Sequence, residues 1–448
     1  MSIETASVRA VLPPGPRGPG ILPLLGALVA RDRTVALLTR RYGPTFTVRV
    51  PILGPAVVIS DSELIKRVFQ AKPDVVERPV LNLGEFFGPG SIFSLEGEQH
   101  QERRKLLVPP LHGRRMREYE GIVEEETRNE VASWPEGEEF AVLPSTMRIT
   151  LNIILRAVFG AEDEELSELR VLLPDMVAIG SRLASSPVGR TLSGPLSPRG
   201  RLERRRRRFR EVVRVLIDKA QADPNLEERE DILSLLLLAR YDDGSAMSHH
   251  EIGDELLTLL AAGHETTATT LAWAIERARR HPAVLRRLTE EADTEDAAYR
   301  HAFIQEVQRV RPVILETGRR VVAPSMQLGQ WTLPQGCTIL VDIRSAHRGA
   351  TGFPHAGLFD PDRFLDAAPD VYSWVPFGGG RRRCIGAAFA TMEMNVVLRT
   401  LLREFEIGVT DAPAERNHHR GVASAPADGG RILVRRRARQ AIGADTAP

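Results

Sequence analysis

The stretch FGGGRRRCIG, from Phe377 to Gly386, places three glycines, three arginines and one cysteine directly before a segment with a helical pattern. Glycine allows backbone N–H groups to approach a sulfur atom closely. A helix N-terminus and nearby arginines lower the pKa of a thiol and so favour the thiolate. We therefore expect Cys384 to be an anion that serves as a nucleophile or as a metal ligand.

The alternative for Cys384 is a buried, inert thiol, which is the usual state of a lone cysteine. Cys337 fits that description, because it lies in the apolar run CTILVDI without basic neighbours. Zinc is not favoured at Cys384, since one cysteine without a closely spaced second ligand does not make a tetrahedral site. Two cysteines in 448 residues make no disulfide framework and favour a reducing, cytoplasmic location.

Upstream of this stretch, the sequence predicts one unusually long helix. It begins at the capping-box pair Ser248 and Glu251 and continues without a proline until Pro282. About 33 residues would measure ~50 Å, enough to cross a domain of this size. The centre of the helix, from Leu256 to Gly263, is almost entirely apolar, so we expect it to be buried on most sides.

Four polar residues, His264, Glu265, Thr266 and Thr267, interrupt this apolar helix. A buried carboxylate in a helix lowers the stability of the fold unless it is paired with a positive charge or hydrated, so an unpaired one suggests a functional role. One interpretation is structural: Thr266 bonds back to a carbonyl one turn earlier and bends the helix. The other is a proton relay, in which Glu265 and Thr266 conduct protons from solvent to an oxygen species. The two interpretations are compatible and both stay open.

The rest of the chain predicts a mainly α fold with small β-sheets. Short β-branched runs at 46–50 and 56–60 suit a hairpin, and strand signals return at 319–323 and 337–343. A final amphipathic helix is expected from about residue 385 to residue 405. Between residues 109 and 282 the pattern is helical, with breaks expected at Pro135, Pro174, 193–200, Pro224 and 242–244.

The 60 basic and 59 acidic residues nearly cancel, so no whole-molecule field attracts nucleic acid and no such partner is expected. The basic run from Arg201 to Arg210 is interpreted as a solvated helix face, with a peripheral membrane contact as the lesser alternative. The apolar segment from Ile21 to Ala30 is about half the ~20 residues that a membrane span requires. No transmembrane anchor is therefore expected.

At this point the motifs resemble those of the cytochrome P450 family. The haem-loop pattern FxxGxRxCxG matches at Phe377, Gly380, Arg382, Cys384 and Gly386. AGHETT, from Ala262 to Thr267, is similar to the family's oxygen-activating helix motif. Glu306 and Arg309 match its ExxR pair, and Arg363 in DPDRF matches the second arginine of a Glu-Arg-Arg cluster that supports the fold.

The resemblance covers residues 13 to 437 and implies a cytochrome P450 fold. We expect a proline-rich lead-in at residues 1–20, a single large haem domain at 21–437 and a tail at 438–448. The cofactor implied is haem b, with Cys384 as the ligand of its iron. The resemblance implies donors to the haem propionates at His100, Arg104, Arg319 and Arg382, with Arg320 as an alternative to Arg319.

The same resemblance implies a monooxygenase in which Glu265 and Thr266 deliver protons to dioxygen. The sequence contains no dinucleotide fingerprint and no iron–sulfur cysteine cluster, so electrons are expected from a separate ferredoxin or flavodoxin with its reductase. Arg381 and Arg383, which flank the loop, are expected to attract that partner. A haem-thiolate isomerase, lyase or peroxygenase, which needs no electron donor, is the alternative, and a non-catalytic haem sensor or carrier is a third hypothesis.

Positions that match the family's pocket are mostly apolar, which implies a small lipophilic substrate. Glu316 is the exception, and either orients a polar group of the substrate or faces solvent. Fatty acids, terpenoids, steroids and polyketides all remain open. The pocket residues expected are Phe86, Phe87, Ala262, Ile314, Glu316 and Val422.

Overall fold

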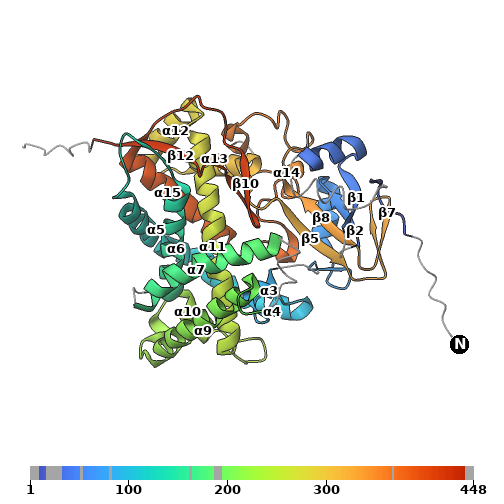
Figure 1. Cartoon of the computed structure of the whole chain (residues 1–448), viewed down its shortest axis with the longest axis horizontal. Coiled ribbons are helices and arrows are strands. Elements are labelled where there is room, and N and C mark those ends of the chain that lie inside the picture. The colour runs from blue at the N-terminus through green and yellow to red at the C-terminus, as the bar shows by residue number, and fades with distance from the viewer. Residues whose placement is uncertain are drawn as a thin grey trace, which may run out of the picture.

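The structure is a computed structural model, and it describes residues 10–16, 33–50, 54–79, 83–160, 164–185, 194–365 and 368–438. A large helical part occupies one side of the molecule and a smaller part rich in β-strands occupies the other (Figure 1). The predicted class, mainly α with small β-sheets, is confirmed. Most of the expected lead-in and almost all of the expected tail lie outside the described residues.

The largest sheet has the order β1-β2-β8-β5-β3. Its first two strands form the predicted hairpin, with Thr45 opposite Ile59, and β8 continues the sheet parallel to β2. Alternate residues of these strands, such as Val57 and Ile339, are fully buried because they pack beneath α2. The bounds are β1 Thr45–Val50, β2 Gly54–Ile59, α2 Ser62–Gln70, β3 Val76–Glu77, β5 Glu316–Val321, β6 Ser325–Leu328, β7 Trp331–Pro334 and β8 Thr338–Asp342.

The helical part contains most of the other elements. Its helices are α3 Gly84–Phe87, α4 Gly97–Leu107, α5 Met116–Val131, α6 Leu143–Phe159, α7 Glu164–Ser185, α9 Pro198–Ala222, α10 Ile232–Leu238, α11 His249–Ala278, α12 Pro282–Ala292, α13 Ala298–Val310, α14 Ile343–Ala346 and α15 Ala387–Glu404. Its strands are β4 Glu139–Ala141, β9 Phe405–Ile407, β10 Asn417–Arg420, β11 Ala423–Pro426 and β12 Arg431–Arg436. A further helix covers residues 33–42.

Helix α11 is the predicted long helix, and it runs for 30 residues through the helical core. The Ser248 side chain accepts a hydrogen bond from the Glu251 amide, and the Glu251 carboxylate accepts one from the Ser248 amide, so the predicted capping box is confirmed. Most of its side chains are buried, and it packs against α6, α13, α15 and the β10-β11 hairpin. Among the described residues, no helix has both the length and the apolar character needed to cross a membrane.

The break expected at Pro174 is wrong, because α7 continues through this residue. A proline in a helix removes one backbone hydrogen bond and bends the helix. Leu172, Leu173 and Met176 are buried on both sides of Pro174, so packing keeps the two halves of α7 together.

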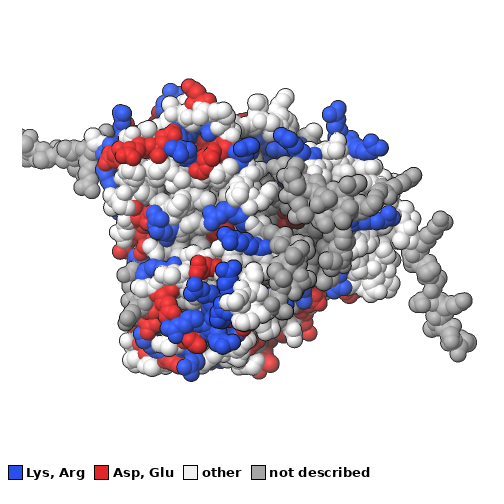
Figure 2. Space-filling model, viewed as in Figure 1, with Lys and Arg blue, Asp and Glu red and all other residues white. Residues whose placement is uncertain are grey.

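Helix α9 contains the basic run expected to form a solvated face. Arg205 pairs with Asp175 at 2.8 Å and Arg208 pairs with Glu168 at 2.6 Å, both on α7. Figure 2 shows the resulting mixture of basic and acidic side chains on this part of the surface. Arg206 departs from the expectation: it is buried, and its guanidinium lies 3.7 Å from Asp254 of α11.

Candidate functional site

The loop before α15 is shaped by close packing against α2. The backbone amide of Cys384 donates to the carbonyl of Phe377 at 2.9 Å and closes the loop. Gly380 has a φ of 64°, in the left-handed region that favours glycine. A Cβ atom at Gly379 would overlap the ring of Phe69, and one at Gly380 would overlap the carbonyl of Phe69. These glycines therefore allow α2 to lie directly against the loop.

The Cys384 side chain is accessible although protein surrounds it, so it borders an interior space. Burial raises the pKa of the Cys384 thiol, and the Gly386 amide, Arg383 and Arg104 offset this only in part. The protein groups around Cys384 therefore do not by themselves lower the pKa of this thiol. The reason is that the loss of solvation outweighs the nearby positive charges, and α15 begins only at Ala387. A coordinating metal ion would itself deprotonate the thiol.

The middle of α11 also borders an interior space. Ala262, Gly263 and Thr266 are partly accessible, although the helix is buried on either side of them. Their spacing places them on one helix face. The Thr266 hydroxyl donates to the Ala262 carbonyl at 2.8 Å, so the predicted bond to the preceding turn is confirmed. From α6, Thr150 donates to the His264 carbonyl at 3.0 Å.

Glu265 is only 6% exposed and lies beside α7 and the β10-β11 hairpin. Burial raises its pKa, while the charge of Arg420 and a hydrogen bond with Ser181 offset this only in part. Glu265 therefore retains its proton at a higher pH than an ordinary carboxyl group. A carboxyl group with a raised pKa, next to Thr266, is suited to donate a proton.

Five basic residues gather beside the cysteine loop, and we call them the cationic cluster: His100, Arg104, Arg319, Arg381 and Arg382. Arg319 donates to the Gly379 carbonyl at 3.1 Å, and Arg382 donates to the Leu95 carbonyl at 2.7 Å. Burial lowers the pKa of Arg319 to about 10, helped by repulsion from Arg382 and Arg381. Burial lowers the pKa of His100 to about 3, helped by Arg382 and Arg104, so His100 is uncharged near neutral pH and the positive charge of the cluster comes from its arginines.

The Glu-Arg-Arg residues predicted from the sequence lie together in the core. Arg309 and Glu306 form a two-pronged ion pair with N–O distances of 2.6 and 2.7 Å, and both side chains are fully buried. Arg363 approaches Glu306 at 3.3 Å. Arg309 also donates to the carbonyls of His347, Ala356 and Leu358. The pair is thus a core cluster and not the surface pair that its spacing alone would predict.

The expected pocket residues come from four separate segments. Phe86 and Phe87 lie on α3, where the ring of Phe87 is 5.5 Å from that of Phe93. The amide of Ser424 donates to the Val313 carbonyl at 2.8 Å, which brings the turn at Val422 toward Ile314. Glu316 is exposed at the start of β5.

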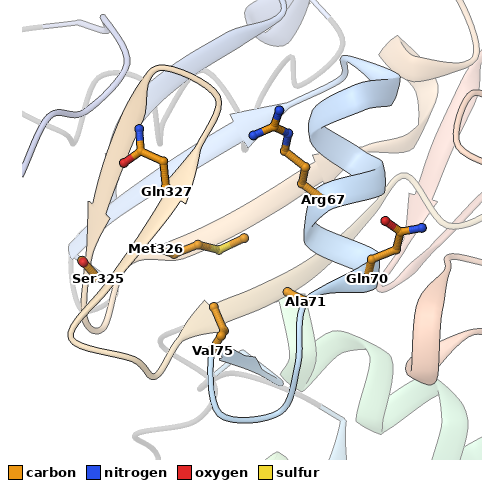
Figure 3. A pocket seen from close by; sticks show the side chains of 7 residues that line it. All are labelled: Arg67, Gln70, Ala71, Val75, Ser325, Met326 and Gln327. Carbon is orange, nitrogen blue, oxygen red and sulfur yellow. The ribbon is translucent and has the colours of Figure 1, made fainter.

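A separate groove of about 510 Å³ opens on the strand-rich part of the molecule. Figure 3 shows its residues on α2, on the turn before β3 and on β6. The groove includes none of the residues expected to bind haem or substrate. Its lining residues are Arg67, Gln70, Ala71, Val75, Ser325, Met326 and Gln327.

The sequence model of the cytochrome P450 family matches residues 15–430. The chain belongs to the cytochrome P450 family. It is 51% identical over 426 residues to cytochrome P450 138 of Mycobacterium tuberculosis, covering 95% of this chain and 97% of that protein. It is 38% identical over 437 residues to cytochrome P450 135B1 of the same organism, covering 95% of this chain and 91% of that protein.

Solved cytochrome P450 structures have the same fold. A retinoic-acid-bound cyanobacterial CYP120A1 superposes with a TM-score of 0.84 at 23% identity and covers 96% of this chain and 100% of that chain. The haem domain of cytochrome P450DA gives the same TM-score at 20% identity and covers 96% of this chain and 98% of that chain. At this level of identity the likeness concerns the fold alone.

Cytochrome P450 proteins bind haem b through a cysteine thiolate, and the site fits this cofactor. Haem b carries two propionate carboxylates, which require charged or hydrogen-bonding donors. The cationic cluster supplies such donors: Arg382 Nε and Arg381 Nη1 are buried without a hydrogen-bond partner in the structure. Haem b would fill the interior space beside Cys384. Its two propionates would balance the surplus of positive charge in the cationic cluster.

Several residues of this cytochrome P450 site have no signal in the sequence. Glu77 accepts hydrogen bonds within the cationic cluster, and Ser181 and Arg420 lie beside Glu265. Glu393 of α15 is fully buried and hydrogen-bonds with Thr267, and burial raises its pKa well above the usual range. Each belongs to a different segment from its partner, so only the folded structure reveals it.

Arg381 and Arg383 differ in a way that the sequence does not predict. Arg381 turns inward, pairs with Glu77 at 3.3 Å and donates to the Val76 carbonyl. Arg383 is exposed. The expected partner-facing patch therefore lacks Arg381.

Proposed function

We propose that the chain is a monooxygenase that transfers one oxygen atom of O2 to a lipophilic small molecule, by hydroxylation or epoxidation, and reduces the other atom to water. The observation that carries this proposal is the acid–alcohol pair Glu265 and Thr266, at the point where the buried helix α11 borders an interior space. Cysteine-ligated haem supplies the reduction and cleavage of dioxygen.

The proposed roles follow from the surroundings of each residue. Cys384 is the iron ligand, and residues 21–437 form the haem domain. His100, Arg104, Arg319 and Arg382 hold the propionates. Arg319 is preferred to Arg320 because its guanidinium contacts the cysteine loop at Gly379. Glu306, Arg309 and Arg363 keep the surrounding core in place.

Proton delivery is assigned to Glu265 and Thr266. Burial raises the pKa of Glu265, which favours its protonated form, and Ser181 hydrogen-bonds to its carboxyl group while the charge of Arg420 acts on it. Thr266 presents its hydroxyl on the accessible face of α11 and can pass a proton on by rotating away from the Ala262 carbonyl. The pocket proposed for the substrate is lined by Phe86, Phe87, Ala262, Ile314 and Val422, which favours an apolar molecule.

Electrons are proposed to come from a ferredoxin or flavodoxin with its reductase. The exposed Arg383, one residue before Cys384, supports an acidic partner on this side of the molecule. The test is oxygenation of a lipophile that produces a spin-state change on binding. We expect product only when reduced nicotinamide, the reductase and the small redox protein are all present. Equal turnover without electron donors, or with peroxide alone, would instead support the isomerase, lyase or peroxygenase function.

Replacing Thr266 with alanine should separate electron consumption from product formation. Loss of the hydroxyl removes the proton donor nearest the reaction, so nicotinamide oxidation is expected to continue while product yield falls by about 10-fold or more. The measurement compares product, peroxide and nicotinamide consumed. Thr270→Ala, which removes a similar bond to the Thr266 carbonyl, is the control and should remain coupled. Unchanged coupling in Thr266→Ala would leave this residue with a structural role only.

A further inference from the structure

Glu77, at the end of β3, is the one carboxylate seen to contact the cationic cluster within the described residues. It is only 5% exposed. Its oxygens lie 3.0 Å from Arg382 and 3.3 Å from Arg381. They also accept hydrogen bonds from the backbone amides of Gly97, at 3.1 Å, and Arg78, at 3.3 Å.

These contacts connect the three segments that carry the proposed propionate donors. Gly97 begins α4, the helix that bears His100 and Arg104. Glu77 lies opposite Arg320 in the β3-β5 pairing, next to Arg319. Arg382 belongs to the cysteine loop itself. The Glu77 carboxylate therefore connects α4 with the loop, and the strand pairing of the same residue connects both with β5.

The charges in this region do not balance. Burial opposes ionisation of Glu77, but hydrogen bonds from Arg382 and Gly97 and the charge of Arg381 outweigh it and lower its pKa. Glu77 is thus an anion among several cations. It leaves Arg382 Nε and Arg381 Nη1 without partners, so donors remain for further carboxylates.

We infer that Glu77 is a positioning residue that assembles the cationic cluster for haem and lowers the reduction potential of the bound cofactor through its negative charge. The inference rests on the proposed haem site. Reduction adds an electron to the cofactor, and a buried negative charge nearby disfavours that addition because the interior screens it poorly. The cationic cluster alone would favour reduction, and Glu77 opposes this effect.

The test is the reduction potential of the holoenzyme with Glu77→Gln. This variant keeps the size of the side chain, but it removes the charge and replaces one acceptor oxygen with an NH2 donor. We expect the reduction potential to rise by about 59 mV, which corresponds to a shift of about tenfold in the one-electron equilibrium toward the reduced form. We also expect haem to transfer to excess apomyoglobin several-fold faster, because the arginines lose their fixed partner.

Two further variants separate charge from structure. Glu96→Gln removes a nearby charge from a side chain that is 40% exposed and pairs with Arg78 at 3.1 Å, and it should leave the potential unchanged. Glu77→Asp retains the charge and should keep the potential close to that of the parent protein. An unchanged potential in Glu77→Gln, or an equal shift in Glu77→Asp, would overturn the inference. Failure of the parent protein to show a thiolate–haem spectrum would instead refute the proposed function.

Discussion

The Cys384→Ala variant is expected to lose the long-wavelength carbon monoxide difference band of thiolate-ligated haem, together with all turnover. Electron donation from the sulfur to the iron produces that spectrum and favours cleavage of the O–O bond. The thiol lies beside an interior space, and no other cysteine belongs to the loop, so no neighbouring sulfur can take its place. The measurement is the spectrum of the reduced, carbon-monoxide-treated protein after reconstitution with haem.

Cys337 provides the matched control for this experiment. Its thiol is buried just before β8 and makes long contacts, of 3.6 Å, to the carbonyls of Pro55 and Thr338. Burial raises its pKa to about 11, as expected for an inert thiol. Cys337→Ala should keep both the band and the activity. Persistence of the thiolate band in Cys384→Ala, or its loss in Cys337→Ala, would contradict the ligand assignment.

The Arg309→Ala variant is expected to lose about 3–5 kcal/mol of unfolding free energy, because removing one partner of a buried ion pair leaves the other charge uncompensated. Glu306 would retain only Arg363, at 3.3 Å, and the amide of Asp360. Three backbone carbonyls would also lose their donor. A domain is typically stable by only about 5–15 kcal/mol, so much of the variant should fail to retain haem.

Urea unfolding followed by circular dichroism measures this loss. The control is Lys105→Ala, which breaks an ion pair with Asp242 in which both side chains are mostly exposed. No measurable change in its unfolding midpoint is expected, because solvent screens such pairs. A loss of less than about 1 kcal/mol in Arg309→Ala would show that the cluster does not stabilise the fold.

Local patterns in the sequence predict much of this molecule. The hairpin at 46–50 and 56–60 and the capping box at Ser248 depend on residues close together in the chain, and both are confirmed. The loop around Cys384 and the Glu306-Arg309 spacing are also local, which is why the amino-acid sequence by itself indicates the family.

Features that depend on distant partners could not be predicted in this way. Glu77 and Arg382 are 305 residues apart, and nothing near either one indicates the pairing. The pKa of Cys384 depends on how completely other segments surround it, so the basic residues next to it in the chain do not by themselves determine its charge. Pro174 shows the same limit, because packing overrides a local helix-breaking tendency.

The contact of Phe69 with Gly379 and Gly380 has a consequence for the assembly of the protein. Helix α2 supplies a surface against which the loop near the other end of the chain packs. A fragment that begins after α2 would retain Cys384, the long helix α11 and the arginines of the cationic cluster. It would lack the surface of α2 that supports the conformation of the cysteine loop. Haem incorporation should therefore follow the packing of the first third of the polypeptide against the last third during folding.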